Sequence, residues 1–370
     1  MIIKNGLVYQ EDGTFQQSDL YIEQELISNE TSDNEIIDAT GQYVIPGLID
    51  IHFHGCVGYD FCDGTQKAIE SIAQYEAQNG ITSIVPATMT LDDSTLNEIF
   101  KAAGEYSNES GAMLMGIHME GPYLSEAKKG AQNAKYLKTP TTQHFRAMNQ
   151  LSGNLIKIVS IAPETTGAMD VIQELHNEVV VSLAHTTADY ETAMEAFQKG
   201  ASHVTHLYNA MLPFTHRAPG ILGAAFDSPN CRVEVICDGI HIVPSAIRAT
   251  FKLFGPERII LVSDSMMATG LSDGEYALGG QPVHVKGNKA TLSDGTIAGS
   301  ATNLMDCVRT AVSFGIPFEH AVKCATINPA KEVGIDSQVG SIAKGKYANL
   351  VLLDSKLNTV SVILKGKVLR

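Results

Sequence analysis

Eight short apolar runs recur along the middle of the chain. They lie at residues 48–53, 83–86, 113–117, 156–161, 179–183, 204–207, 233–236 and 259–262. Stretches of helical composition lie between several of them, at 68–78, 96–106, 169–175 and 193–197. Strands of a parallel sheet are buried on both faces, so they read as continuous apolar runs. Eight such runs alternating with helices over residues 48–335 predict an α/β fold, a (β/α)8 barrel of the TIM type. The pattern is less regular after residue 265.

The two ends of the chain have a different pattern, of short β-rich pieces separated by turns. The N-terminal pieces fall within residues 1–45, and the C-terminal ones within 342–351 and 360–368. Gly and Asn punctuate both groups, as is typical of hairpins and meanders. We therefore expect one small β-sandwich domain built from both termini. The expected boundaries are 1–47 and 336–370 for its two parts and 48–335 for the barrel.

Charge and composition exclude some classes of partner. The 370 residues include 26 Lys and Arg against 41 Asp and Glu, which gives a net charge of −15. No basic block occurs, and this argues against nucleic acid, because phosphate backbones are bound by clustered cations. An anionic ligand would need a local basic pocket that works against the overall field.

The sequence also predicts a compartment. No apolar stretch reaches the roughly 18 residues of a membrane span. The N-terminus has no charged segment followed by an apolar one, as a secretory signal would. The six cysteines form no CxxC pair, and we expect them to be reduced apolar fillers. These features favour a cytoplasmic protein without a membrane partner.

Residues that can bind metal follow several of the apolar runs. In a (β/α)8 barrel the active site lies at the C-terminal ends of the strands. The first run ends in His52 and His54, which share one face because side chains in a strand alternate. Other runs are followed by Glu120, His185, His206, Asp238, His241 and Asp264.

Each of these residues alone has a more ordinary explanation. A single histidine is more often a hydrogen-bonded core residue, Glu120 could be an ion-pair partner, and Asp264 could cap a helix. Their joint placement at different strand ends favours an open site for a divalent metal such as Zn or Fe. Asp264 is then the natural base beside a metal-activated water. For His118 and His203 we expect supporting or structural roles.

Longer segments resemble a known family. They lie at residues 46–55, 118–123, 205–211, 237–241, 263–270 and 295–300. The first is similar to the first-strand signature of the amidohydrolase superfamily. The others resemble the N-acetylglucosamine-6-phosphate deacetylase family within it. Glu-Gly-Pro at 120–122 and His-Leu-Tyr-Asn-Ala-Met at 206–211 are specific to that family, and the resemblance runs from residue 40 to 350.

The resemblance implies a metal bound by Glu120, His185 and His206. It implies a further metal position at His52 and His54, with help from Asp264. Some family members keep this histidine pair and others have lost it, so one or two ions per subunit are both compatible with the sequence. Asp264 matches the family's catalytic acid and base.

The resemblance also implies a substrate-binding set: Ala131, Gln132, Asn209, Ala210, Arg217, Asp238, His241, Ile297, Ala298 and Gly299. Asn209, the Ala210 backbone, Arg217 and His241 match positions that bind the sugar phosphate. Arg217 offers the planar fork that suits a phosphate, although the position also reads as a surface arginine. Gln132 departs from members that have histidine there. The family completes its phosphate pocket across a dimer interface, which implies a homodimer.

The activity implied is hydrolysis of the acetamide of N-acetylglucosamine 6-phosphate to glucosamine 6-phosphate and acetate. One alternative is another amidohydrolase, such as a cyclic amidase or a deaminase. Cyclic amidases bridge two metals with a carboxylated lysine on the fourth strand, but here that strand ends in residues 160–164, which include no lysine. A second alternative is a catalytically inactive barrel that serves as a binding protein. Such relatives usually lose ligands, whereas this chain keeps them.

Overall fold

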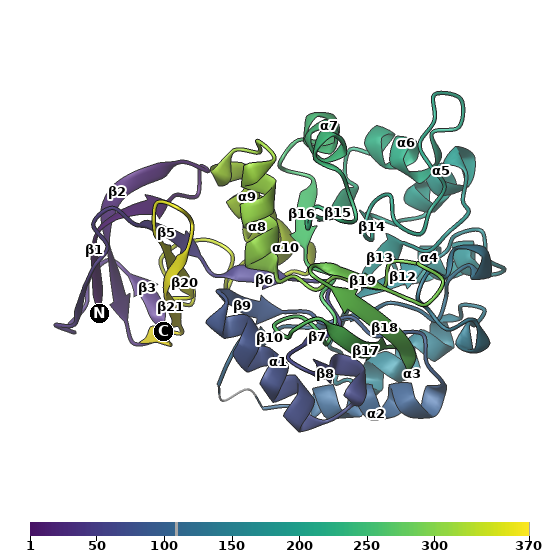
Figure 1. Cartoon of the computed structure of the whole chain (residues 1–370), viewed down its shortest axis with the longest axis horizontal. Coiled ribbons are helices and arrows are strands. Elements are labelled where there is room, and N and C mark those ends of the chain that lie inside the picture. The colour runs from purple at the N-terminus through teal and green to yellow at the C-terminus, as the bar shows by residue number, and fades with distance from the viewer. Residues whose placement is uncertain (108–109, 370) are drawn as a thin grey trace.

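The computed structural model describes residues 1–107 and 110–369, and it contains a β-rich end beside a larger α/β body (Figure 1). The strands of the β-rich end are β1 (Ile2–Tyr9), β2 (Phe15–Glu23), β3 (Leu26–Ser28), β4 (Ile36–Asp38), β5 (Tyr43–Pro46), β20 (Leu350–Leu353), β21 (Thr359–Leu364) and β22 (Lys367–Val368). They form one mixed sheet in the order β22-β21-β20-β5-β1-β2-β3, with β4 paired to β1. Strand β5 joins the two halves, because it pairs parallel with β1 and antiparallel with β20. The two termini therefore meet in one sheet.

The α/β body is organised around parallel strands. They are β6 (Leu48–Asp50), β9 (Ile81–Ile84), β10 (Met113–Leu114), β11 (Ile117–Met119), β12 (Ile156–Ile161), β13 (Val180–Leu183), β14 (His203–Val204), β15 (Arg232–Ile236) and β16 (Ile259–Val262). They pair in the orders β10-β9-β6 and β11-β12-β13-β14-β15-β16. Backbone hydrogen bonds connect the two groups of strands. The His118 N–H donates to the Pro86 carbonyl at 2.9 Å, and the Thr88 N–H donates to the His118 carbonyl at 2.9 Å.

The first and last parallel strands also come together. The Asp264 N–H donates to the His52 carbonyl at 2.9 Å, and the Ser263 hydroxyl donates to Asp50 Oδ2 at 2.5 Å. The sheet is therefore curled, and the chain after β16 lies against the chain after β6. This contact brings the histidine pair close to Asp264.

The predicted strands are present with shifted limits. Each of the eight apolar runs overlaps a parallel strand, but the third run is divided between β10 and β11. The sixth run extends to residue 207, whereas the strand formed there, β14, ends at Val204. The reason is local, because His206 adopts a left-handed backbone conformation with φ of 32° that a strand cannot contain.

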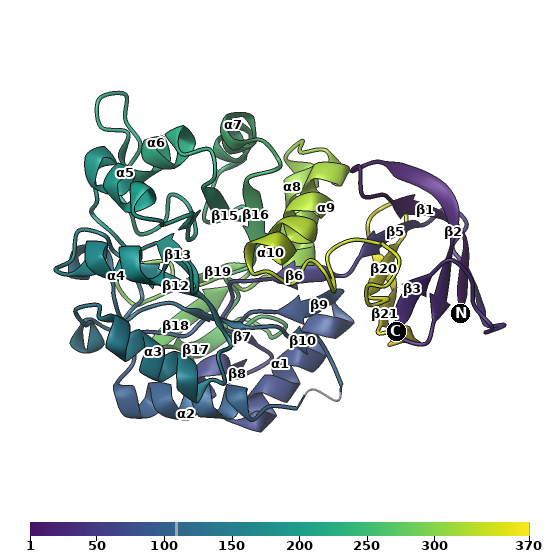
Figure 2. The ribbon, with the colours of Figure 1, turned by 180° about the vertical axis from the view of Figure 1, so that it is seen from behind.

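Helices cover the outer side of the curled sheet, as the two opposite views show (Figures 1 and 2). They are α1 (Gln66–Gln78), α2 (Asp93–Gly104), α3 (Thr142–Leu151), α4 (Ala168–Leu175), α5 (Tyr190–Gln198), α6 (Gly220–Asp227), α7 (Pro244–Phe254), α8 (Leu304–Ser313), α9 (Phe318–Ala325) and α10 (Ile327–Glu332). Thr65, Asp92, Thr141, Asp189 and Asn303 cap five of them by accepting backbone N–H groups. The four predicted helical stretches coincide with α1, α2, α4 and α5.

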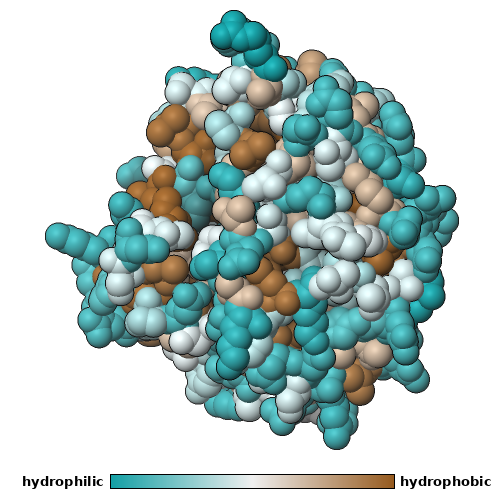
Figure 3. Space-filling model, turned by 90° about the vertical axis from the view of Figure 1, so that its right-hand side faces the viewer, coloured by the Kyte–Doolittle hydropathy of each residue, from teal (hydrophilic) through white to brown (hydrophobic). Residues whose placement is uncertain are grey.

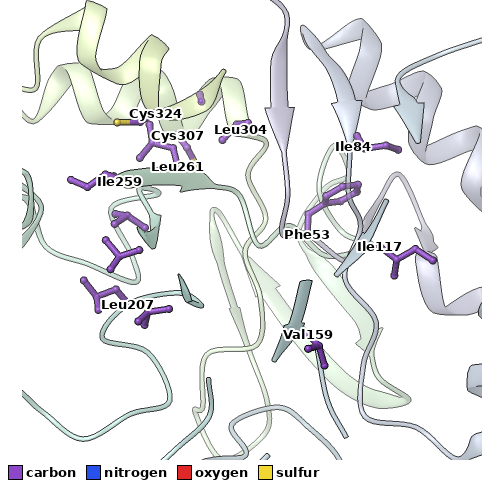
Figure 4. Close-up of a cluster of buried hydrophobic side chains, with 14 of the residues drawn as sticks. Phe53, Ile84, Ile117, Val159, Leu207, Ile259, Leu261, Leu304, Cys307 and Cys324 are labelled. Carbon is purple, nitrogen blue, oxygen red and sulfur yellow. The ribbon is translucent and has the colours of Figure 1, made fainter. Parts of the chain in front are cut away.

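Two apolar cores hold the sheet. Along β16, Ile259 and Leu261 join the core between sheet and helices, whereas Ile260 and Val262 join a separate core inside the curl. Figure 4 shows part of the outer core, where Leu261 lies beside Cys307 of α8. The apolar core inside the curl lies away from the strand ends that carry His52, Glu120 and Asp264.

A small antiparallel sheet lies between β16 and α8 in the chain, in the region where the sequence pattern was least regular. Its strands are β17 (Gly274–Leu278), β18 (Gln281–Lys286) and β19 (Lys289–Thr291). Its apolar side packs on Met89 and Met266, which places the sheet over the strand ends. A two-stranded hairpin, β7 (Gly55–Cys56) and β8 (Tyr59–Asp60), follows the histidine pair.

Two expectations about the whole chain are tested directly. The six cysteines are all free thiols, as predicted. Within residues 1–107 and 110–369, no helix has the length and apolar character needed to cross a membrane.

Candidate metal centre and active-site cavity

Glu120, His185 and His206 converge at the strand ends. Glu120 follows β11 directly, and the two histidines lie two residues beyond β13 and β14. Glu120 Oε1 is 3.1 Å from His185 Nε2 and 3.1 Å from His206 Nε2, and the two nitrogens are 3.0 Å apart. Their side chains are almost fully buried. Strands far apart in the sequence thus contribute three potential ligands to one point.

The backbone at these positions is unusual. His185, His206 and Asp264 have φ of 45°, 32° and 49°, in the left-handed region that non-glycine residues rarely adopt. Such conformations cost about 1–3 kcal/mol each and cluster at functional sites. Gly121 has φ of 89°, and a Cβ there would approach Thr90 Oγ1 to 2.1 Å, so only glycine allows the chain to turn after Glu120.

His52 and His54 extend the cluster on the other side of Glu120. His52 Nε2 lies 3.5 Å from Glu120 Oε1, and His54 Nε2 lies 3.4 Å from Glu120 Oε2. Asp264 Oδ1 is 3.3 Å from His54 Nε2 and 3.8 Å from His52 Nε2. The carboxylate of Glu120 therefore lies between the two groups of histidines, with Asp264 beside the histidine pair.

The hydrogen bonds of the rings test whether a cation fits. His185 Nδ1–H donates to the Lys128 carbonyl at 2.9 Å, and His52 Nδ1–H donates to Glu234 Oε2 at 2.7 Å. In both rings Nε2 is therefore the nitrogen left to bind a cation, and it faces Glu120. Among the described residues His52 Nε2 has no hydrogen-bond partner. Nitrogen and carboxylate oxygen atoms at these distances are held together by a proton or by a metal cation between them.

The donor set suits a divalent metal. Ligands about 2.0–2.2 Å from Zn²⁺ in a tetrahedral site lie roughly 3–3.5 Å from one another, as these atoms do. The atoms of Glu120, His185 and His206 all fall within 4.8 Å of one another, and so do those of His52, His54 and Glu120. Burial opposes ionisation of Glu120, but the surrounding imidazoles hold its pKa well below the ordinary value. The residues thus fit one or two ions.

A cavity of about 340 Å³ opens over this cluster. The proposed ligands His54, Glu120, His185 and His206 and the proposed base Asp264 reach its wall. The predicted substrate residues that line it are Ala131, Gln132, Asn209, Ala210, His241, Ile297 and Gly299. Leu278 of β17 also lines it, so the small antiparallel sheet forms part of the wall. Lys128 adds a cationic side chain that the sequence analysis did not single out.

Three predicted substrate residues do not reach this cavity. Arg217 is exposed in the loop before α6 and lines a separate pocket with Tyr190 and Asp227. Asp238 Oδ2 accepts the His241 Nδ1–H at 2.7 Å, so Asp238 orients His241. Ala298 is fully buried in the core of the antiparallel sheet. None of these three side chains is therefore placed to contact a ligand in the cavity of its own subunit.

Gln132 lines the cavity but contacts protein at both ends of its amide. Its Nε2–H donates to Glu120 Oε2 at 2.9 Å, and its Oε1 accepts the Thr90 N–H at 2.7 Å. The side chain is buried. Gln132, which replaces the histidine of other family members, thus orients the proposed metal ligand Glu120 by a hydrogen bond.

Sequence reasoning missed Glu234, a buried carboxylate in β15. It accepts hydrogen bonds from His52, His203 and the backbone of His206. Its only signal in the sequence is an acidic residue within the apolar strand Arg232–Ile236. His118 and His203 have the expected supporting contacts, since His118 Nε2 bonds to Ser160 Oγ at 2.8 Å.

Comparisons with known proteins agree with this geometry. The model of the Amidohydrolase family matches residues 43–369. N-acetylglucosamine-6-phosphate deacetylase of Bacillus subtilis (strain 168) is 36% identical over 374 residues, covering 99% of this chain and 93% of that protein. N-acetylgalactosamine-6-phosphate deacetylase of Escherichia coli O157:H7 is 31% identical over 336 residues, covering 90% and 89%.

Solved structures give the same result. N-acetylglucosamine-6-phosphate deacetylase of Pasteurella multocida superposes with a TM-score of 0.93 at 29% identity, over 99% of this chain and 98% of that one. A mutant of the Mycobacterium smegmatis enzyme in complex with N-acetyl-D-glucosamine-6-phosphate has a TM-score of 0.93 at 30% identity, over 100% and 98%. The family match and the full-length similarity lead to one conclusion. The chain belongs to the amidohydrolase family.

Proposed function

We propose that this chain hydrolyses the acetamide of N-acetylglucosamine 6-phosphate to glucosamine 6-phosphate and acetate. The observation that carries the proposal is the convergence of Glu120, His185 and His206 within 3.0–3.1 Å at the wall of a cavity. The activity named for the relatives at 31–36% identity supports the choice of reaction. The phosphorylated substrate bound to the Mycobacterium smegmatis relative supports the choice of ligand.

We assign the first metal position to Glu120, His185 and His206, and the second to His52 and His54 with Asp264. Imidazole and carboxylate ligands suit Zn or Fe. These residues would hold a divalent cation, which would supply polarisation of the acyl carbonyl and a lowered pKa, about 7, for a bound water. Glu120 lies between both positions, so its carboxylate would contribute to holding an ion at either one.

Asp264 is the proposed general base and acid. Its carboxylate takes a proton from water as the water oxygen bonds to the acetyl carbon. It then delivers this proton to the sugar nitrogen as the carbon–nitrogen bond breaks, so the amine leaves neutral. The oxygen and the second proton of the water stay on the acetyl group as acetic acid, which then ionises to acetate. Asn209, the Ala210 backbone and His241 line the same cavity, and we assign them to the sugar phosphate.

We extend the proposal to the architecture and assembly. The curled sheet is assigned as a complete (β/α)8 barrel over 48–335, with the terminal sheet as a β-sandwich from 1–47 and 336–370. The bond from Asp264 to His52 between the two end strands supports this assignment. We further propose a homodimer, in which Arg217 serves the cavity of the other subunit. The free thiols support a cytoplasmic location.

A direct assay tests the activity. Purified protein loaded with Zn²⁺ or Fe²⁺ is expected to release acetate from N-acetylglucosamine 6-phosphate, with the bound metal counted in the same sample. The galactosamine isomer and the unphosphorylated sugar measure the specificity. Metal-loaded protein without acetate release from any of these would refute the proposal, and ring opening or ammonia release from other amides would favour the alternative amidohydrolases.

The variant Asp264→Asn tests the role of the base. We expect turnover to fall about 10²–10⁴-fold, because the proton transfer loses its carrier. Asparagine tolerates the left-handed backbone at this position, so the fold and the ion at Glu120, His185 and His206 should be retained. Circular dichroism and metal analysis check both. Near-native turnover of the folded, metal-loaded variant would exclude Asp264 from this role.

A further inference from the structure

Glu234 is a buried charged residue of β15, and the other buried residues of this strand are apolar. Its neighbours Val233 and Val235 join the core on the helix side, whereas Ile236 joins the core inside the curl. Because side chains of a strand alternate, Glu234 also points inside the curl. It is completely buried, and a buried carboxylate is retained only where its oxygens are hydrogen-bonded or ion-paired.

Both oxygens of Glu234 are engaged. Oε2 accepts the His52 Nδ1–H at 2.7 Å and the backbone N–H of His206 at 3.1 Å. Oε1 accepts the His203 Nε2–H at 3.0 Å. One carboxylate thus contacts a ligand of each proposed metal position, and it is not among the residues that line the cavity.

The contacts continue toward the surface. His203 Nδ1 lies 2.9 Å from Glu332 Oε1, and Arg232 pairs with the other oxygen of Glu332. A ring that faces carboxylates on both nitrogens donates through both, so His203 is an imidazolium. The chain Arg232–Glu332–His203 therefore supplies positive charge behind Glu234 and leaves its Oε2 oriented toward His52.

We propose that Glu234 is the positioning residue that makes the His52 and His54 half of the site a metal position. This proposal rests on the proposed metal site, which the activity assay tests separately. By accepting the Nδ1–H, Glu234 holds His52 in the tautomer whose Nε2 lone pair faces Glu120 and Asp264. A carboxylate behind a ligand histidine both orients the ring and raises its basicity, and its loss typically lowers metal affinity 10–100-fold.

Two matched variants separate the effect of the length of the Glu234 side chain from the effect of its charge. Glu234→Asp keeps the charge but withdraws the carboxylate by one methylene, so it no longer reaches His52 Nδ1. Glu234→Gln keeps the reach and can still present its oxygen to His52, while its amide N–H faces His203, which can accept at Nε2 and donate to Glu332. We therefore expect the aspartate variant to lose the second ion and the glutamine variant to keep it.

The test is metal stoichiometry of the full chain, by elemental analysis and by calorimetric titration of metal-free protein with Zn²⁺. We expect two ions in the wild type and in Glu234→Gln, with less than a tenfold loss of affinity in the latter. In Glu234→Asp we expect one tightly held ion, the second at least tenfold weaker. Two ions with wild-type affinity in the aspartate variant would overturn the inference, and so would a wild type that binds only one.

A second measurement covers the case in which the aspartate variant does not fold. Long-range ¹⁵N–¹H spectra of the Zn²⁺-loaded wild type, assigned with His52→Asn, report whether Nδ1 of His52 carries a proton while Nε2 binds the ion. A proton on Nδ1 supports the inference, and an Nδ1 that binds the ion or carries no proton overturns it. These outcomes leave the proposed function intact, because that proposal fails only if metal-loaded wild type releases no acetate.

Discussion

Gln132 shows how a single side chain can support the site while touching none of the reacting atoms. Its amide links Glu120 Oε2, at 2.9 Å, to the backbone N–H of Thr90, at 2.7 Å. We expect Gln132→Ala to weaken Zn²⁺ binding about tenfold, because Glu120 loses the donor that orients it. Titration of metal-free protein with Zn²⁺ measures this directly.

Gln132→Glu is the matched control for this prediction. It keeps the acceptor for Thr90 but places a carboxylate oxygen against Glu120, so the loss of Zn²⁺ affinity should exceed that of the alanine variant. An alanine variant with unchanged Zn²⁺ affinity and a raised KM would instead assign Gln132 to the substrate, as the family resemblance implied.

The limits of sequence reasoning are clear at the same scale. The residues proposed to bind metal could be found because imidazole and carboxylate side chains follow apolar runs. Glu234 could not, because its partner His52 lies 182 positions away and nothing local joins them. The left-handed turns at His185, His206 and Asp264 were also hidden, since such strain is held by tertiary contacts and not by the residue type.

At the scale of elements, α1 contains a buried carboxyl that helix periodicity would assign to an apolar residue. Glu76 lies on the inward face of α1 with Ile69, Ile72 and Ala73. Neither of its oxygens has a hydrogen-bond partner among the described residues, although the Cys56 thiol lies close by. Burial, and then the nearby Asp50, raise the pKa of Glu76 well above its ordinary value.

This placement predicts that Glu76 destabilises the fold at neutral pH. The folded state holds the proton while the unfolded chain releases it, so the free energy of unfolding falls as pH rises above the ordinary carboxyl pKa. We expect Glu76→Met to raise the free energy of unfolding by about 1–3 kcal/mol at pH 7. Urea denaturation at several pH values measures the effect.

Glu76→Gln is the control for charge. It still buries polar atoms without partners, but it cannot ionise, so its advantage over the wild type should vanish near pH 4 and grow toward pH 8. If the free energy of unfolding of the wild type changes no more between pH 4 and pH 8 than that of the glutamine variant, the pKa of Glu76 is not raised.

Elements differ in how well the sequence predicts them. The parallel strands are buried on both faces, so eight apolar runs were sufficient to locate them. The antiparallel sheet at 274–291 was missed, because its strands are short and partly exposed, with apolar contacts concentrated at Leu278, Val283 and Val285. It folds by packing on Met89 and Met266, which are distant in sequence or belong to another element.

At the scale of the whole molecule, the net charge of −15 repels a phosphate, so its binding requires cationic side chains close to the cavity. Within the described residues, Lys128 is the only lysine or arginine that lines the cavity. Arg217 lies outside it, in an exposed segment with Leu212 and Phe214. Hydrophobic side chains gather toward the upper left of the face in Figure 3, which looks on the end that carries α4 to α6. Contiguous exposed apolar patches mark interaction surfaces, whereas single exposed apolar residues are ordinary.

These features lead to a prediction for a homodimer in which the partner's Arg217 completes each cavity. Light scattering should give a mass of twice 39.7 kDa. We expect Arg217→Ala to lower kcat/KM for the phosphorylated substrate about 10–100-fold, because a charged hydrogen bond to phosphate is worth roughly 1.5–3 kcal/mol. The unphosphorylated sugar should be hydrolysed at an unchanged rate.

Mixed dimers decide from which subunit the arginine acts. When Arg217→Ala and Asp264→Asn subunits are unfolded and refolded together in equal amounts, half of the dimers are mixed. Each mixed dimer then has one cavity with an intact Asp264 and with Arg217 supplied by the other chain. If Arg217 acts across a two-fold interface, about a quarter of the wild-type activity at low substrate should return. If it acts within its own subunit, no cavity in any dimer holds both residues and the mixture stays as inactive as its components.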